Sequence, residues 1–378
     1  MRRIDTLIGA VSISASTSTS VLSVTRLNST EYPLAACLDG SPYPYYFQNG
    51  SNSSKFVVWL MGGGDCGTAQ ACAARSGRAA SGLEQFWPDE LPMSTYLPEQ
   101  GSRNASYNPL LFDANIAFLP YCDGGYFGGQ VRDPVLYGNR KLYLRGRHNL
   151  EGTIQHLLQY RGLDDATEVI VGGCSAGAMA VFLHLDRIAG LLPKARVGGL
   201  SDSGYYLFEP TSTPGWAEPE VAFHNFSGLL NRECVAAQPA GAGWRCLQTD
   251  ISAPYLKTPL FAMQSRFDIN QLSYSPCHSI PGSKATYGDC VNAYGANLTE
   301  SIRRWLAHTL HHGAFIDGCS RHCQHAVAAG PTANGTTNLR ALEDWWRAPP
   351  QQRQADRQAL WEQRGAYPCA SCCQQLPA

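Results

Sequence analysis

Short apolar and β-branched runs alternate with amphipathic stretches along most of the 378-residue chain. Strands that alternate with helices form a mostly parallel sheet that helices cover on both faces. The expected strands are 55–61, 114–120, 168–171, 260–264 and 313–316, and the expected helices are 150–160, 178–188 and 298–310. We therefore predict an α/β fold.

Two stretches interrupt this alternation, at about residues 72–113 and 205–251. Both are rich in proline, glycine and aromatic residues. We expect them to pass over the carboxyl edge of the sheet, where open α/β sheets bind their ligands. The sequence thus predicts a loop-rich partial cap at that edge.

No internal repeat or linker divides the chain after Leu34, so we expect one domain over residues 31–378 with a cysteine-rich C-terminal tail. Residues 1–30 begin with Arg2 and Arg3 and continue into a partly apolar segment rich in serine and threonine. We interpret them as a signal peptide or a disordered leader, with a wrongly assigned start as the alternative. No window approaches 18 uninterrupted apolar residues, so no membrane span is expected.

Charge and composition exclude several classes of protein. The 29 basic and 30 acidic residues nearly cancel, which argues against a nucleic-acid partner, and 10% aromatic residues argue against global disorder. Fourteen cysteines favour an oxidising compartment. Asn-x-Ser/Thr sequons, of which about two are expected by chance, begin at Asn28, Asn49, Asn52, Asn104, Asn225, Asn297 and Asn334. We therefore expect a secreted or cell-wall glycoprotein, whose oligomeric state stays open.

The strongest local motif is Gly173-Cys174-Ser175-Ala176-Gly177, between an expected strand and an expected helix. This context is typical of a nucleophile elbow, in which a tight turn lifts the serine hydroxyl above the sheet. Glycine two positions before and after the serine avoids clashes within the turn. We predict that Ser175 is a nucleophile, and the alternative is a glycine-rich turn with a surface serine.

A serine nucleophile needs an orienting acid and a base, which follow it along the chain in that order. Asp268 comes four residues after the expected strand 260–264, on a loop at the carboxyl edge of the sheet, and is the predicted acid. Asp202, which also follows an apolar stretch, is the main rival. Aspartates in poorer contexts are Asp250 and Asp289.

His322 is the predicted base. It follows the expected strand 313–316 on a loop that Cys319 and Cys323 would pin, and a catalytic histidine needs such a rigid loop. The remaining histidines after the acid are His278, His325 and the helix-associated His308, His311 and His312.

Backbone amides must stabilise the oxyanion in such a site. The residue after the nucleophile, Ala176, supplies one amide, and a loop after an early strand supplies the others. Gly62-Gly63-Gly64 follows the expected strand 55–61 and fits that loop, although a flexible turn is the alternative. The chemistry requires no cofactor.

Beyond these single residues, the sequence resembles the pectin acetylesterase family, whose members include plant cell-wall polysaccharide deacetylases and the animal Notum-type palmitoleoyl-protein carboxylesterases. The similarity covers roughly residues 34–373, in the family's order. The blocks are VWLMGGGDC (58–66), LPYCDGGYFGG (119–129), LYLRGRHNLEGTIQHLL (142–158), GGCSAGAMAVFLHLD (172–186), LSDSGY (200–205), RFDINQ (266–271), FIDGCSRHCQ (315–324), Asp344–Trp346 and YPCASCC (367–373).

The resemblance implies an α/β-hydrolase-like fold and the same three residues: Ser175 as nucleophile, Asp268 as acid and His322 as base. It also implies that the amides of Gly63, Gly64 and Ala176 bind the oxyanion.

This chain departs from the family pattern at three positions. Asp65 stands near the usual place of an aromatic residue, Ala178 at that of a second glycine, and Asn270 at that of a tryptophan. None of these changes removes a catalytic group. Asp65 and Asn270 belong to the expected pocket, so they bear on the substrate.

The cysteines suggest a disulfide framework, in which Cys66–Cys72 and Cys234–Cys246 are plausible short loops. Cys174, inside the elbow, is expected to be a buried free thiol. A zinc site is the alternative, and in a secreted chain it is less favoured because the same spacings suit disulfides. Its ligands would be Cys319, His322, Cys323, His325, Cys369 and Cys372.

We predict a serine carboxylesterase that removes acetyl groups from an extracellular polysaccharide such as pectin. In that case Tyr126 and Phe127 would close a short acyl pocket. The first alternative is a Notum-like esterase acting on a fatty-acylated protein, with an apolar pocket walled by Trp216, Phe223, Phe226, Leu229 and Leu230. The second is a catalytically retired carbohydrate-binding protein, against which the intact catalytic residues argue.

Overall fold

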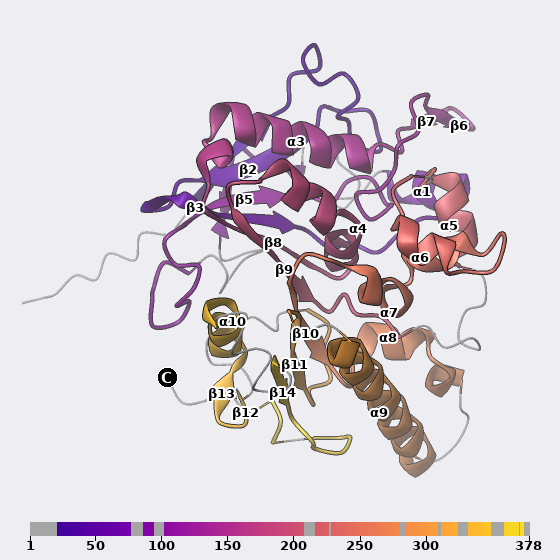
Figure 1. Ribbon diagram of the computed structural model, residues 1–378. Coiled ribbons are helices and arrows are strands. Elements are labelled where there is room, and N and C mark those ends of the chain that lie inside the picture. The colour runs from indigo at the N-terminus through magenta and orange to yellow at the C-terminus, as the bar shows by residue number, and fades with distance from the viewer. Residues whose placement is uncertain are drawn as a thin grey trace, which may run out of the picture.

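The computed structural model is built around one large twisted sheet (Figure 1). It describes residues 21–76, 86–93, 102–207, 216–226, 228–279, 284–308, 311–323, 332–348, 359–369 and 371–373. In spatial order the sheet consists of β14 (Ala359–Glu362), β11 (Gly313–Asp317), β10 (Leu260–Ser265), β9 (Arg196–Asp202), β8 (Glu168–Cys174), β3 (Asn52–Leu60), β5 (Ala114–Leu119), β2 (Pro44–Gln48), β1 (Val21–Arg26) and β4 (Glu90–Pro92).

The strands from β14 to β5 are all parallel to their neighbours, whereas β2, β1 and β4 extend one edge in antiparallel pairings. Because successive side chains of a strand point to opposite faces, each central strand contributes to two cores. In β3, for example, Val58 belongs to one buried cluster and Val57 to the other.

Helices cover both faces of the sheet (Figure 1). On one face, α3 (Gly146–Tyr160), α4 (Ala176–Leu191) and α9 (Lys284–His308) bury their apolar sides in the larger cluster. On the other face, α10 (Asn338–Arg347) contributes Leu342, Trp345 and Trp346. The parallel sheet is thus buried on both sides, as such sheets require.

Short helices and loops gather near the carboxyl edge of the sheet. The first segment, after β3, contains α1 (Ala69–Arg75), and the second, after β9, contains α5 (Ala217–Phe223), α6 (Arg232–Ala236), η4 (Gly243–Leu247) and α7 (Thr249–Ser252). The remaining short elements are β6 (Val135–Tyr137), β7 (Arg140–Leu142), η3 (Leu163–Asp165), η5 (Ala253–Tyr255), α8 (Ile269–Tyr274), η6 (Pro276–Ser279), β12 (Thr332–Ala333) and β13 (Thr336–Thr337).

All fourteen cysteines are paired. The disulfides are Cys37–Cys122, Cys66–Cys72, Cys174–Cys323, Cys234–Cys246, Cys277–Cys290, Cys319–Cys373 and Cys369–Cys372. Seven disulfides fit an extracellular protein, because disulfides persist in oxidising compartments. Among the described residues, no helix is both long and apolar enough to span a membrane.

The α/β fold with a mostly parallel sheet is confirmed. Each strand and helix expected from the sequence is present, and β1, β2, β4, β9, β14 and α10 are additional.

The expected leader is wrong for residues 21–30. Residues Val21–Arg26 form β1, which pairs with both β2 and β4, and Leu22 and Leu27 are buried. The folded region therefore begins before residue 31. The first twenty residues lie outside the described part of the chain.

Candidate active site

Ser175 occupies the turn between β8 and α4, with φ +56° and ψ −123°. Residues with a side chain rarely adopt such a backbone, and strain of this kind gathers at functional sites. A Cβ atom at Gly173 would lie 2.5 Å from the Gly177 carbonyl group, and one at Gly177 would lie 2.1 Å from the Leu60 oxygen. Both glycines are therefore required, and the turn has the geometry expected of a nucleophile elbow.

His322 and Asp268 form a buried hydrogen-bonded pair. The Nδ1 atom of His322 lies 2.9 Å from each carboxylate oxygen of Asp268, whose side chain is fully buried. This contact places the imidazole proton on Nδ1 and leaves the lone pair on Nε2. The Nε2 atom is buried and has no hydrogen-bond partner among the described residues. It is therefore available to accept a proton.

The Asp268 carboxylate is held by three further donors. It caps the N-terminus of α8, where Oδ1 accepts from the backbone amides of Asn270 at 2.9 Å and Gln271 at 3.3 Å. Its Oδ2 accepts from Gln264 Nε2 at 3.1 Å. These donors stabilise an ionised carboxylate in a buried position.

Two disulfides pin the loop that carries His322, as the sequence predicted. Cys319 is bonded to Cys373, and Cys323 is bonded to Cys174, with 5.7 Å between the last two Cα atoms. The residue before the elbow serine is thus covalently joined to the residue after the histidine.

The expectation that Cys174 is a free thiol is therefore wrong. Parallel strands direct all their carboxyl ends to one edge, so the loop after β11 meets the elbow after β8. The alternative zinc site fails for the same reason, because Cys319, Cys323, Cys369 and Cys372 are all in disulfides and cannot act as thiolates. His325 lies outside the described residues.

Tyr206, four residues after β9, contacts the same site. Its hydroxyl donates to Asn270 Oδ1 at 2.9 Å and lies close to the Ser175 side chain. Its ring meets that of His322 nearly at right angles, with 6.4 Å between the ring centres. Sequence reasoning missed Tyr206, because no motif or periodicity marks it.

The glycine loop after β3 runs beside the elbow. A Cβ atom at Gly62 would lie 2.9 Å from Ser175 Cβ, and Gly64 has a left-handed φ of +73°. In the described part of the chain, the amides of Gly63, Gly64 and Ala176 donate to no protein acceptor. They remain free to bind an anionic oxygen.

Arg75, at the end of α1, holds this loop from its other side. Its Nη2 donates to the carbonyl oxygen of Gly63, and its Nη1 donates to that of Asp65 at 3.3 Å. Sequence reasoning also missed this residue, since an arginine at a helix end usually lies in solvent.

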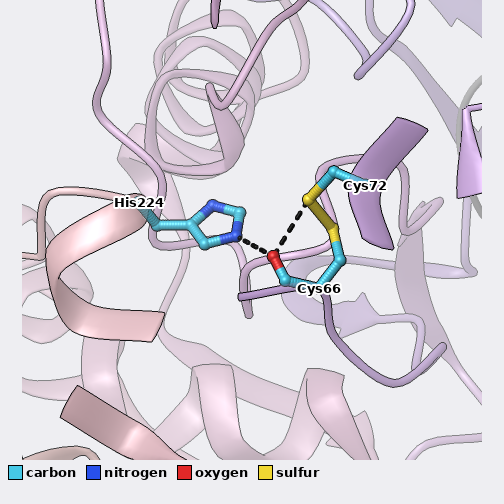
Figure 2. A group of neighbouring side chains, drawn as sticks. All are labelled: Cys66, Cys72 and His224. Atoms are coloured by element: carbon cyan, nitrogen blue, oxygen red, sulfur yellow. Dashed lines mark hydrogen bonds between the residues drawn. A yellow bond between two sulfur atoms is a disulfide. The ribbon is translucent and has the colours of Figure 1, made fainter. Parts of the chain in front are cut away.

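Behind the loop, Cys66, Cys72 and His224 come close together (Figure 2). His224 Nε2 donates to the Cys66 carbonyl oxygen at 2.9 Å. Such a group would suit a metal only if both sulfurs were thiolates, and here they form a disulfide. The cluster therefore anchors the loop to α1 and α5 and offers no metal site.

Two buried carboxyl groups lie beside this cluster. Burial, with smaller contributions from the neighbouring Asp65 and Asp123 charges, raises the pKa of Glu220 to about 9, and burial raises the pKa of Asp123 to about 7. Burial also lowers the pKa of His224 to about 4. The side chains of Glu220 and His224 are thus both neutral at pH 7 and form no ion pair, although Oε1 of Glu220 lies 3.3 Å from Nε2 of His224.

The rival acids lie in other environments. The Asp202 carbonyl accepts from the Ser175 amide at 2.9 Å, and its carboxylate contacts Ser203, while the His322 ring pairs with Asp268. Asp250 lies on α7 and Asp289 is exposed on α9.

The rival histidines are also accounted for. His278 and His308 are exposed. His312 is buried between the Leu260 amide and the Leu256 carbonyl group, and burial lowers its pKa to about 3. The neighbouring His311 ring packs against that of His312 at a tilt of 51°, with 4.2 Å between the ring centres. His312 is thus held by two backbone groups, whereas His322 is held by a buried carboxylate.

The residues suggested as pocket walls mostly lie in the core. Phe226, Leu229 and Leu230 belong to the main buried cluster, and Trp216 and Phe223 pack against buried clusters at their edges. Of the other pair, Phe127 packs on Tyr121, and Tyr126 packs against Trp216 with 6.2 Å between the ring centres.

Fold and site together define an α/β-hydrolase-like protein with a serine elbow. The family model for pectinacetylesterase matches residues 15–374, and the chain belongs to this family. Membership makes it a carboxylic ester hydrolase, as predicted.

Relatives of two kinds match the chain. Pectin acetylesterase 11 of Arabidopsis thaliana is 30% identical, over 85% of this chain and 87% of its own length. The palmitoleoyl-protein carboxylesterase NOTUM of Mus musculus is 27% identical, over 82% of this chain and 63% of its own length. A structure of the Wnt deacylase Notum from Drosophila superposes with a TM-score of 0.76 at 24% identity, covering 94% of this chain and all of that one. This last likeness supports the fold.

Proposed function

We propose that the protein is a secreted serine esterase that removes acetyl groups from a cell-wall or other extracellular polysaccharide such as pectin. The catalytic part of this proposal rests on the hydrogen-bonded pair of His322 and Asp268. In the described structure His322 Nε2 has no hydrogen-bond partner, and a disulfide joins the histidine loop to the elbow.

In the proposed reaction, His322 Nε2 takes the Ser175 proton while Oγ attacks the ester carbonyl carbon. The developing oxyanion accepts hydrogen bonds from the amides of Gly63, Gly64 and Ala176. The histidine then gives its proton to the sugar hydroxyl that leaves, and an acyl-enzyme remains. Water, activated by the same nitrogen, releases acetate and restores Ser175. Asp268 keeps the proton on Nδ1 throughout.

The preference for acetyl over fatty acyl groups rests on two supports. The pectin acetylesterase relative matches this chain along most of its length. In addition, Phe226, Leu229 and Leu230, which the fatty-acyl alternative would need as pocket walls, pack in the core. A retired carbohydrate-binding protein would have no reason to keep a strained serine and a fully supported acid–histidine pair.

Replacing Ser175 by alanine tests the catalytic assignment. We expect Ser175→Ala to abolish acetate release from an aryl acetate and from acetylated pectin, apart from a residual acceleration of about 10³–10⁴ over water. A fluorophosphonate should label the wild-type protein at Ser175 alone. Ser273→Ala, at the exposed end of α8, serves as the control and should keep wild-type rates. Wild-type rates in Ser175→Ala would refute the assignment.

A further inference from the structure

The surface next to Ser175 is polar on the side of Tyr206 and Asn270. The Tyr206 hydroxyl donates to Asn270 Oδ1 at 2.9 Å and lies close to the Ser175 side chain. Both side chains are half-buried. The Tyr206 ring also lies against that of His322, with 6.4 Å between the ring centres, so the pair borders the catalytic residues.

Tyr206 is fixed in this position by its backbone. The Tyr206 amide donates to Thr249 Oγ1 at 2.8 Å. Gln271 holds the residues on either side: its Nε2 donates to the Tyr205 carbonyl oxygen at 3.2 Å, and its Oε1 accepts from the Leu207 amide at 3.0 Å.

The partner of Tyr206 is equally constrained. The Asn270 amide donates to Asp268 Oδ1, so the backbone of Asn270 is part of the helix cap that supports the acid. The backbones of both residues are therefore fixed, and the hydrogen bond between the two side chains holds each in place.

A rigid polar wall discriminates against apolar chains. In an apolar pocket each buried methylene favours binding by up to about fourfold. Against a hydroxyl and an amide that gain is lost, because the chain desolvates polar groups and offers them no hydrogen bond. An acetyl methyl group is too short to cover the wall.

We propose that Tyr206 and Asn270 determine acyl specificity by forming a polar wall beside Ser175 that excludes long apolar acyl groups. This inference rests on the proposed function, in which Ser175 carries the acyl group. It assigns the preference for short esters to two named side chains.

The test compares kcat/KM for p-nitrophenyl acetate, butyrate and octanoate in the wild type and in Tyr206→Phe, Asn270→Leu and the double variant. We expect the octanoate-to-acetate ratio to rise at least about tenfold in the double variant, with smaller rises in the single variants. Tyr205→Phe is the matched control. It removes a hydroxyl that contacts only the buried Ser301 in the described structure, and it should leave the ratio within about twofold.

The outcomes separate the two claims. An unchanged ratio in a double variant that still hydrolyses acetate would overturn the wall. If the substitutions instead change how kcat/KM depends on the size of the alcohol in a series of acetates, the pair faces the leaving group. That result would overturn the wall too. A wild-type protein without esterase activity, or a Ser175→Ala variant as active as the wild type, would refute the proposed function itself.

Discussion

At the scale of single residues, the site combines one strained backbone with several buried polar side chains. Ser175 is held at φ +56° by the glycines around it, and the Asp268 carboxylate accepts hydrogen bonds from four groups. Glu220 is different, because burial keeps its carboxyl group protonated. It lies behind the glycine loop and affects the stability of the fold more directly than the chemistry.

Glu220→Gln should change how stability depends on pH. The pKa of Glu220 rises from 4.5 to about 9 on folding, so between these values the folded state holds a proton that the unfolded chain has released. The free energy of unfolding should therefore fall as the pH rises through this window, by at most about 1.4 kcal/mol per pH unit. Glutamine cannot titrate, so the free energy of unfolding of the variant should fall less over this pH range.

Urea unfolding of the wild type and Glu220→Gln from pH 5 to 9 checks this. Glu233→Gln is the matched control, since that carboxylate is exposed and paired with Lys257 at the surface. Parallel stability curves for the wild type and Glu220→Gln would contradict a protonated Glu220.

At the scale of elements, α1 acts as the support of the glycine loop. The Cys66–Cys72 disulfide joins loop and helix, and Arg75 donates from the helix end to two carbonyl groups of the loop. A short helix in the first excursion thus sets the position of amides that the proposed mechanism needs.

Arg75→Gln should lower kcat by about 10–100-fold with little change in KM, because the loop amides lose their alignment with the oxyanion. Arg140→Gln is the control: Arg140 also donates to an α1 carbonyl group, that of Ala73, without touching the loop. Its kcat should stay within about twofold of the wild type. Steady-state kinetics, with melting temperatures for both variants, makes the comparison. Equal losses in the two variants would assign the effect to α1 as a whole.

Local sequence patterns predicted the strands and helices that consist of continuous apolar runs, and they also predicted the turn around Ser175. The strand at β3 and the motif around Ser175 are visible because neighbours in sequence determine them. Strand β1, second from the edge of the sheet, was missed because its sequence VLSVTR has no apolar run, and its stability comes from pairing on both sides. The α10 helix was not predicted, although Leu339, Leu342 and Trp346 have helical spacing.

The parts of the site that escaped prediction depend on contacts between distant segments. Asp268 and His322 could be chosen from their positions after strands, and the geometry brings them together. Tyr206 and Arg75 contact the site only through tertiary packing, which leaves no periodic signal. The pairing of Cys174 with Cys323 spans 149 residues, and spacing alone cannot select it among fourteen cysteines.

At the scale of the whole molecule, seven disulfides divide into local clips and long-range ties. Cys234–Cys246 closes a loop of 12 residues in the cap, whereas Cys174–Cys323 connects the centre of the sheet to the loop after β11. Both stabilise the fold by restricting the unfolded chain. Only the second joins the elbow to the base.

Replacing Cys174 and Cys323 together by serine should lower the free energy of unfolding by about 2–5 kcal/mol and also reduce activity per folded molecule. The paired change of Cys234 and Cys246 should cost stability while leaving that activity near the wild-type value. The two variants are compared by their activity well below both melting temperatures. Circular dichroism gives the folded fraction to which each activity is normalised. Equal specific activities would show that the tie has no part in aligning Ser175 and His322.

The bond between Cys174 and Cys323 also sets where the chain can become an enzyme. In a reducing compartment the two sulfurs stay apart and the histidine loop has one anchor fewer. Oxidation then completes the fold and the catalytic geometry in the same step. Under the proposed function, the activity of the folded chain therefore depends on the oxidation state of these two sulfurs.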